Sequence, residues 1–494
     1  MKEYRFSLLT SVFVGLSAHM FMFTNKLPNW DDYLYLFGKG CELESGRWGL
    51  SIMSWVFPDF SMPWLWGIVS LLLVCVFTCF TIYIFQIKSP ILQCLLSGLI
   101  IAVPALTATF SYMFTSSAYM LGICASVLSV YFMQKGGWKN VVIASLFLII
   151  SLSIYQAYLA ITSSYLLLLL FQAQLSCTET PKETFRRGMG YLLFLAATVV
   201  LYLAITFLLL YLSKTSLNGY AVWKLTHGVG FLGRLVYIYL FFGGYILLGL
   251  YGVVPTGPSR LAHIVCALVV LWLVARSCVQ KKDRGRTALL LVCLILLPMA
   301  SNCIVLMGGV YATHTLMTFG FISVYVLICI TAETMMVGQQ LRLRDAVILC
   351  MSIMIVGNIY VANRVYLSMH MAYENNFAFY NSIATQIKMT PGFDENSKVA
   401  IIGETAENES LNPFWMKRNP LFPVPNHLVG TDPFQVNVIP KSIFFETYLD
   451  FHVTFATDDE IASLQEDTRF QEMATYPYYG SIEKIDDFIV VKLS

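Results

Sequence analysis

Charged residues are scarce in this chain, where they make up only 12% of the 494 residues. A soluble globular protein carries about 25% charged residues, so an ordinary soluble fold is excluded. Hydrophobic residues make up 57% of the chain. They form apolar runs of roughly 20 residues, and a helical run of that length crosses a bilayer core of about 30 Å. The composition therefore predicts a polytopic helical membrane protein.

A large net charge and metal-type cysteine spacing are also missing. The chain has 31 basic and 29 acidic residues and a formal net charge of +2, whereas a nucleic-acid-binding surface needs concentrated positive charge. Cys75 and Cys79 lie in the middle of an apolar run without histidine partners, which is not a zinc-type spacing. We therefore expect no nucleic-acid partner, and the sequence supports neither a divalent metal nor another cofactor.

Twelve apolar segments are candidate membrane spans. Basic residues in short connections mark the cytoplasmic side, which places Lys2, Arg5 and the clusters at 276–286 and 342–344 inside. The loop 25–63 then lies outside, and the last span runs outward. Twelve crossings would return the chain to the inside, so we expect an odd number, 11 or 13. The candidate spans are residues 6–24, 64–87, 91–109, 112–133, 140–154, 157–175, 190–212, 235–254, 261–276, 287–306, 312–337 and 345–362.

The composition changes after the last candidate span. Residues 1–362 are expected to form the transmembrane bundle, and residues 363–388 a polar, aromatic helix that leaves the membrane. The stretch Met389-Thr390-Pro391-Gly392 ends this helix, and residues 389–494 are expected to form a small extracytoplasmic α/β domain. This expectation rests on two strand-like runs, 398–403 and 487–492. It also rests on a helix N-cap followed by acidic residues, Thr457-Asp458-Asp459-Glu460.

Two adjacent carboxylates, Asp31 and Asp32, follow the first predicted span at the depth of the lipid headgroups. An acidic pair there suits sugar transfer from a lipid phosphate, because a base must take the proton of the acceptor hydroxyl. A structural role is also open, since Asn29 is a natural N-cap and acidic residues in a first turn stabilise a helix by about 0.3–1 kcal/mol each. The two roles are compatible, because a capped helix start holds its side chains rigidly.

Two basic residues of the same loop are candidates for binding the donor phosphate. Arg47 carries a planar guanidinium that matches phosphate geometry, and Lys39 is the second candidate. The alternative is that both residues anchor the loop at the interface or pair with Glu42 and Glu44. For Lys39 we favour that alternative.

Aromatic and polar residues at the predicted outer ends of spans are candidates for substrate binding. Trp30 and Trp48 fit an aromatic belt at the interface, or they stack on a sugar. Tyr155 and Gln156 interrupt apolar sequence at a predicted outer turn, where a polar pair either contacts substrate or joins helices. His314 begins a predicted span and is a candidate for the donor phosphate, with a structural role as the alternative.

The order of these motifs resembles the serotype-converting O-antigen glucosyltransferases of bacteria, the glucosyltransferase II family of GT-C type. The resemblance extends over nearly the whole chain. It is carried by motifs after the first span, at the predicted outer turn and in the tail. These are Asn29-Trp30-Asp31-Asp32, Gly46-Arg47-Trp48, Ser153-Ile154-Tyr155-Gln156-Ala157-Tyr158, Tyr476-Pro477, Gly480-Ser481-Ile482 and Asp487-Phe488-Ile489-Val490-Val491-Lys492.

This resemblance implies an all-α, GT-C-type bundle with a catalytic acid in the first outer loop. By position, Asp31 and Asp32 match the acidic motif and Arg47 matches the glycine-arginine-tryptophan motif, while His314 stands where many such enzymes have a basic phosphate contact. The implied donor is an undecaprenyl-phosphate-linked sugar, commonly glucose. The implied acceptor is a surface polysaccharide or lipid-linked glycan outside the bacterial cytoplasmic (inner) membrane. Which aspartate is the base does not follow from the resemblance.

Two other functions remain as alternatives. A transporter or flippase for lipid-linked saccharides usually has intramembrane charge near the midplane and internal repeats. Here Glu333 is the main acidic residue within a predicted span, and it lies toward the inner end. A polysaccharide polymerase or ligase shares the location and substrates but explains the acidic pair less well. The sequence favours the glycosyltransferase.

Overall fold

The computed structural model divides the chain into two compact units. The first, here the bundle unit, comprises Met1–Asn25 and Phe37–Arg364, and the second, here the sheet unit, comprises Lys26–Leu36 and Val365–Ser494. The first loop is therefore split between them. The structure describes residues 4–29, 31–32, 43–56, 61–218, 229–248, 257–281, 283–308, 314–337, 341–394, 396–405 and 441–494.

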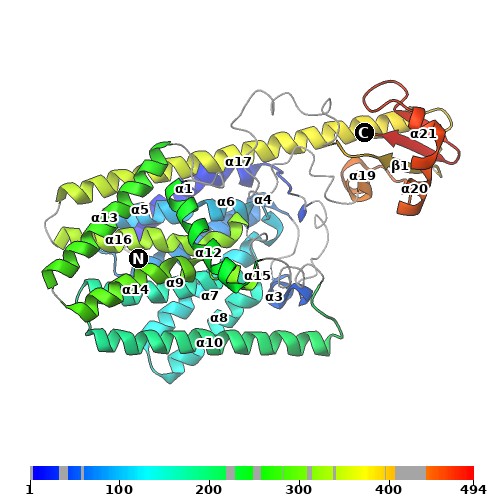
Figure 1. Cartoon of the computed structure of the whole chain (residues 1–494). Helices are drawn as coiled ribbons and strands as arrows, with labels where there is room; N and C mark the ends of the chain where they lie inside the picture. The colour runs from blue at the N-terminus through cyan, green and yellow to red at the C-terminus, as the bar shows by residue number, and fades with distance from the viewer. Residues whose placement is uncertain are drawn as a thin grey trace. The chain divides into compact units, whose positions relative to one another are not determined.

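The bundle unit consists of α-helices and short helical turns (Figure 1). Its turns are η2 (Leu43–Ser45), η3 (Met113–Thr115), η4 (Gln156–Tyr158), the π-helical η5 (Gly244–Leu248) and η8 (Thr315–Phe321). Its α-helices are α1 (Arg5–Thr24), α3 (Trp48–Met53), α4 (Pro63–Ile84), α5 (Pro90–Ile101), α6 (Pro104–Phe110), α7 (Ser116–Lys135), α8 (Trp138–Ile154), α9 (Leu159–Leu175), α10 (Pro181–Leu212), α12 (Phe231–Gly243), α13 (Gly257–Lys281), α14 (Arg284–Ser301), α15 (Ile304–Gly308), α16 (Ile322–Val337) and the start of α17 (Leu341–Met389).

Nine helical stretches among the described residues are long and apolar enough to cross a membrane. The pair α5 and α6, bent by 42° at its break, adds a tenth if it counts as one broken span. This is fewer than the 11 to 13 crossings expected from hydropathy. The predicted spans 140–154 and 235–254 fall on shorter apolar helices, Trp138–Ile154 and Phe231–Leu247. The 17 residues of α8 extend about 25 Å, less than a bilayer core of about 30 Å.

Buried hydroxyl groups join the helices of the bundle. The Ser70 hydroxyl donates to Ser116 at 3.0 Å, which links α4 to the start of α7. The Thr81 and Tyr165 hydroxyls lie 3.2 Å apart and link α4 to α9. Hydrogen bonds of this kind between small polar side chains are a common contact between membrane helices. They place α4, α7 and α9 side by side in the bundle.

Helix α17 is continuous over 49 residues (Figure 1). The predicted span 345–362 and the predicted helix 363–388 are thus parts of one helix. It ends at Met389, and Gly392 follows with φ +82°. Such a backbone conformation is available to glycine at little cost, so the chain can reverse toward the first strand.

A small mixed sheet forms the rest of the sheet unit, in the strand order β2-β1-β4-β3. Strand β1 pairs in parallel with β2 and β4, and β3 pairs antiparallel with β4. The two predicted strands and the Thr457 cap are confirmed, while β2 and β3 were not expected. The elements are β1 (Lys398–Ile402), β2 (Thr454–Phe455), β3 (Ile482–Ile485), β4 (Phe488–Lys492), α19 (Lys441–Leu449), α20 (Asp458–Glu466) and α21 (Thr468–Glu472).

Apolar side chains cover both faces of this sheet. Successive residues of a strand point to opposite faces, so β1 contributes Val399 to one core and Ala400 to the other. The end of α17 and α19 pack on the first face, for example through Tyr380. Helices α20 and α21 pack on the second face through Leu464 and Phe470. The sheet unit therefore has its own hydrophobic core.

Candidate active site

The acidic pair lies in a capped helical turn of the sheet unit. The Asn29 side-chain oxygen accepts the backbone N–H of Asp31 at 2.7 Å and of Asp32 at 3.0 Å. In return, the Asp32 carboxylate accepts the Asn29 backbone N–H at 3.1 Å. This reciprocal pattern is a capping box with aspartate in the third position. The cap predicted from the sequence is confirmed.

The two aspartates differ in exposure. Asp32 is 1% exposed and Asn29 is fully buried, whereas Asp31 is half-buried. The cap uses the carboxylate of Asp32 but the backbone N–H of Asp31. A buried carboxylate that accepts a backbone hydrogen bond is suited to fixing local structure, and a half-buried one is better suited to meeting a substrate.

Aromatic residues of the sheet unit surround this turn. The Lys26 ammonium lies 4.1 Å from the ring centre of Tyr448 and 5.9 Å from that of Tyr373, which are cation–π distances. Burial raises the pKa of the Tyr448 hydroxyl, and the nearby Asp32 carboxylate raises it further because it disfavours a second negative charge. Phe444 stacks on Tyr448 at 5.1 Å. Residues of α17 and α19 thus anchor the acidic turn.

Arg47 belongs to the bundle unit and lies on an aromatic platform. Its guanidinium carbon is 5.5 Å from the ring centre of Tyr155, and its Nη1 donates to the Tyr119 hydroxyl at 3.4 Å. The rings of Tyr119 and Tyr155 are 5.1 Å apart and are 4% and 5% exposed. A guanidinium stacked on aromatic rings is oriented without losing its charge, which is what a phosphate contact requires.

The segment that carries Arg47, residues 43–53 and here the Arg47 loop, is fixed by side chains of distant helices. The Tyr202 hydroxyl donates to the Gly46 carbonyl at 2.8 Å. The Gln156 amide donates to Tyr202 at 3.0 Å and to the Ser45 carbonyl at 3.1 Å. The structure therefore brings together the two motifs around Arg47 and Gln156, which are more than 100 residues apart in the sequence.

The two glycines of the Arg47 loop are required by geometry. Gly46 has φ +76°, and a Cβ there would lie 3.0 Å from the Gln156 amide nitrogen and 3.1 Å from the Tyr202 hydroxyl. At Gly49 a Cβ would lie 2.8 Å from the Ser153 carbonyl carbon. Helix α3 therefore approaches α8 as closely as backbone allows.

Trp48, Tyr155 and Gln156 all take part in this packing. The Trp48 indole N–H donates to the Thr206 hydroxyl at 3.1 Å, Tyr155 lies under Arg47, and the Gln156 amide binds the loop. These contacts give each residue a structural role. Their binding of substrate stays a prediction.

His314, Trp30 and Lys39 are the remaining candidates. His314 is half-buried at the N-cap of η8, where its carbonyl accepts the Met317 N–H at 2.9 Å. Turn η8 packs on η4, with the ring centres of Phe319 and Tyr158 6.0 Å apart. Trp30 and Lys39 lie outside the described residues. The described part of the chain contains no group of three or more His, Cys, Asp or Glu residues that could hold a metal.

Three residues of this arrangement were not singled out from the sequence. They are Tyr119, Tyr202 and Thr206, which contact Arg47, Gly46 and Trp48. Each is a hydroxyl-bearing residue inside an apolar helix. Hydroxyl groups in apolar helices commonly form hydrogen bonds to neighbouring helices. The sequence contains many such hydroxyls and does not indicate which of them face the Arg47 loop.

Comparison with known proteins identifies the family. Residues 20–325 match the family model described as glucosyl transferase GtrII. The match covers more than half of the chain and includes both motifs of the first loop, Tyr155, Gln156 and His314. A comparison with individual characterised proteins found no match. The chain, whose helices are those of a membrane protein, therefore belongs to the GtrII glucosyl transferase family.

Proposed function

We propose that this membrane glucosyltransferase moves a sugar, glucose in the first instance, from a polyprenyl-phosphate carrier to a surface polysaccharide such as O-antigen. The reaction takes place on the extracytoplasmic side of a bacterial cytoplasmic membrane, in a bundle of GT-C type. The observation that carries the proposal is the family match over residues 20–325. The aspartates after the first span and the oriented Arg47 support it, because they supply the two kinds of group that the reaction needs.

The reaction needs a base for the acceptor. As the acceptor oxygen forms its bond to the anomeric carbon, the bond from that carbon to the phosphate oxygen breaks, and the acceptor proton passes to a carboxylate. We assign this role to Asp31, since this residue is half-buried whereas Asp32 is buried. Asp32 is a positioning residue that maintains the helical turn through its bond to Asn29.

The reaction also leaves a carrier phosphate with an additional negative charge. A guanidinium binds phosphate oxygens through two parallel N–H groups. We assign this contact to Arg47, because Tyr155 and Tyr119 orient its guanidinium. Lys39 and His314 remain secondary candidates.

Transport of a lipid-linked saccharide explains less of the molecule. Glu333 would be the intramembrane acid of such a transporter. Its carboxylate accepts the backbone N–H groups of Lys88 at 2.8 Å and Ser89 at 2.6 Å, directly before α5. This capping role accounts for the charge without a transport pathway.

The test is a structural analysis of the surface glycan in cells that express the chain and in matched cells that lack it. The proposal expects one additional hexose on the glycan in the first strain. Proteoliposomes with polyprenyl-phosphate glucose and extracted acceptor should reproduce the addition. An unchanged glycan together with no transfer in proteoliposomes contradicts the proposal, and transbilayer movement of the donor without transfer would favour the transporter.

A further inference from the structure

A cavity of about 740 Å³ lies in the bundle unit, at the end of α9 remote from Gln156. Leu169 and Leu175 of α9 line it, whereas Gln156 precedes the other end of that helix. Leu169, the lining residue of α9 nearest in sequence to Gln156, follows it by 13 positions (169 − 156), about 20 Å along a helix. The cavity is therefore distinct from the packing around Arg47. Its polar lining includes Lys88, Gln134, Gln172, Arg187, Arg276 and Glu333.

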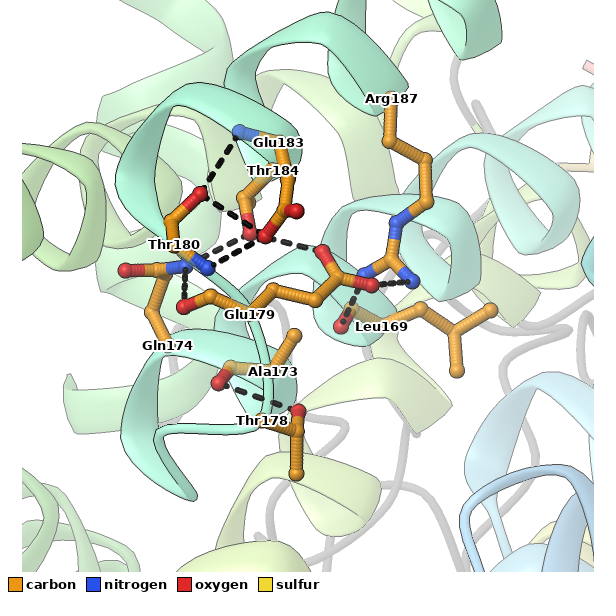
Figure 2. Close-up of polar contacts among 9 residues, drawn as sticks. All are labelled: Leu169, Ala173, Gln174, Thr178, Glu179, Thr180, Glu183, Thr184 and Arg187. Atoms are coloured by element: carbon orange, nitrogen blue, oxygen red, sulfur yellow. Dashed lines mark hydrogen bonds and ion pairs between the residues drawn. The ribbon is translucent and has the colours of Figure 1, made fainter.

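Arg187 is neutralised by its own neighbours. Its guanidinium pairs with Glu179 at 2.5 Å and donates to the Leu169 carbonyl at 3.2 Å (Figure 2). Glu179 also accepts the Thr184 hydroxyl at 2.8 Å, and the Gln174 amide donates to Thr184 at 2.6 Å. Figure 2 shows how these contacts tie the end of α9 to the start of α10. This wall of the cavity is therefore preorganised.

Lys88 and Arg276 supply the remaining positive charge. Both side chains are exposed, and neither forms an ion pair with a carboxylate among the residues that the structure describes. The Arg276 guanidinium stacks on Trp272 at 5.3 Å. The carboxylate of Glu333 is engaged by two backbone N–H groups. The lining thus places two cations against the single carboxylate of Glu333, and the excess of positive charge favours an anion that is not part of the chain.

The cavity also has an apolar side. Leu169, Leu273 and Ile330 contribute hydrocarbon to its lining. On α13, Leu271 is 56% and Trp272 43% exposed, so the surface that leads to Arg276 is apolar as well. A ligand that matches both parts has a negative head and a hydrocarbon tail.

We propose that this cavity binds the phosphate headgroup of an anionic membrane phospholipid. Lys88 and Arg276 bind the phosphate, and an acyl chain lies along α13. Headgroup hydroxyls bind the Gln134 amide and the amide oxygen of Gln172, whose amide nitrogen donates to the Phe85 carbonyl at 2.8 Å. Basic pockets between membrane helices at the cytoplasmic side bind such headgroups. The site is independent of the proposed sugar transfer.

The experiment measures lipid binding by the full-length protein in nanodiscs of phosphatidylcholine with a graded share of phosphatidylglycerol. Native mass spectrometry of the released protein counts the retained lipids. The wild type should retain phosphatidylglycerol in preference to phosphatidylcholine. The double variant Lys88→Gln, Arg276→Gln should bind it about tenfold or more weakly. The matched control is Lys139→Gln, Arg186→Gln, which removes the same charge from exposed residues that do not line the cavity, and it should bind as the wild type does.

Three results would overturn the proposal. The first is a wild type without preference for phosphatidylglycerol. The second is an equal loss in both double variants, which would indicate general surface charge. The third is loss of the retained lipid when millimolar inorganic phosphate is added, which would indicate a site for the free anion. If the double variant does not fold by circular dichroism, Arg276→Gln alone is compared with Arg186→Gln.

Discussion

The two motifs of the first loop are close in sequence, but their hydrogen-bond partners lie at very different distances along the chain. The acidic turn around Asp31 is closed by bonds between residues at most three positions apart. The Arg47 loop is fixed by partners such as Tyr119 and Tyr202, which are 72 and 156 positions from the residues they contact. The acidic turn and the Arg47 loop also belong to different compact units. The hydrogen bonds that close the acidic turn are therefore local, whereas those that fix the Arg47 loop depend on the assembled bundle.

Substitution of the two aspartates should give the largest effect. Asp31→Asn removes the proposed base and should lower the rate of sugar transfer by about 10²–10⁴-fold. Asp32→Asn keeps an oxygen that can accept the Asn29 N–H, so transfer should fall less than about tenfold. The measurement is the initial rate in proteoliposomes at equal protein content. Full transfer by both single variants and by the double variant would defeat the catalytic assignment, and the reverse order would exchange the two roles.

A control separates chemistry from general charge effects. Asp458 is an exposed first-turn residue of α20 in the same unit. Asp458→Asn removes the same charge from a helix start that has no proposed catalytic role. Its transfer rate should remain that of the wild type.

Arg47 substitutions test the other half of the comparison. Arg47→Ala should lower kcat/KM for the donor by about 10–100-fold, since a hydrogen bond to a charged group is worth about 1.5–3 kcal/mol. Arg47→Lys should not restore it, because an ammonium cannot form the planar pair or stack in the same way on Tyr155. Donor saturation curves at fixed acceptor provide the measurement. Unchanged donor dependence in both variants would reduce Arg47 to an anchor of the loop.

The difference between the motifs also explains which features were predictable. The Asn29 and Thr457 caps were predicted, because a cap depends on residues at most three positions apart. The strands around Val399 and Ile489 were predicted from short apolar runs. The partners of Arg47 were not, since any of many hydroxyls could have faced the loop. Among the described residues the long apolar stretches number nine or ten instead of 11 to 13. Hydropathy marks apolar segments but not where a helix bends inside one, as it does between α5 and α6 within the predicted span 91–109.

Gly46 tests whether the shape of the Arg47 loop matters. Gly46→Ala places a Cβ against Gln156 and Tyr202 at φ +76° and should cost about 1–3 kcal/mol of local stability. The KM for the donor should rise as well, because Arg47 loses its orientation. The matched control is Gly190→Ala in α10, where a Cβ meets nothing within 4 Å and helix propensity favours alanine by up to about 1 kcal/mol. Melting temperature and donor KM measure both effects, and equal behaviour of the two variants would contradict the prediction.

The smallest effect on stability is expected from the two helix caps at Asn29 and Thr457, of which only the first lies beside a proposed catalytic residue. Asn29→Ala and Thr457→Ala each remove a cap and should each cost about 0.5–2 kcal/mol of stability. Thr457 caps α20, whose residues have no proposed catalytic role, so its loss should lower the melting temperature and leave transfer per folded molecule unchanged. Asn29→Ala should lower transfer as well, because the bonds that orient Asp31 and Asp32 disappear. Equal transfer per folded molecule in the two variants would mean that the cap contributes to stability alone and that the position of Asp31 is set by other contacts.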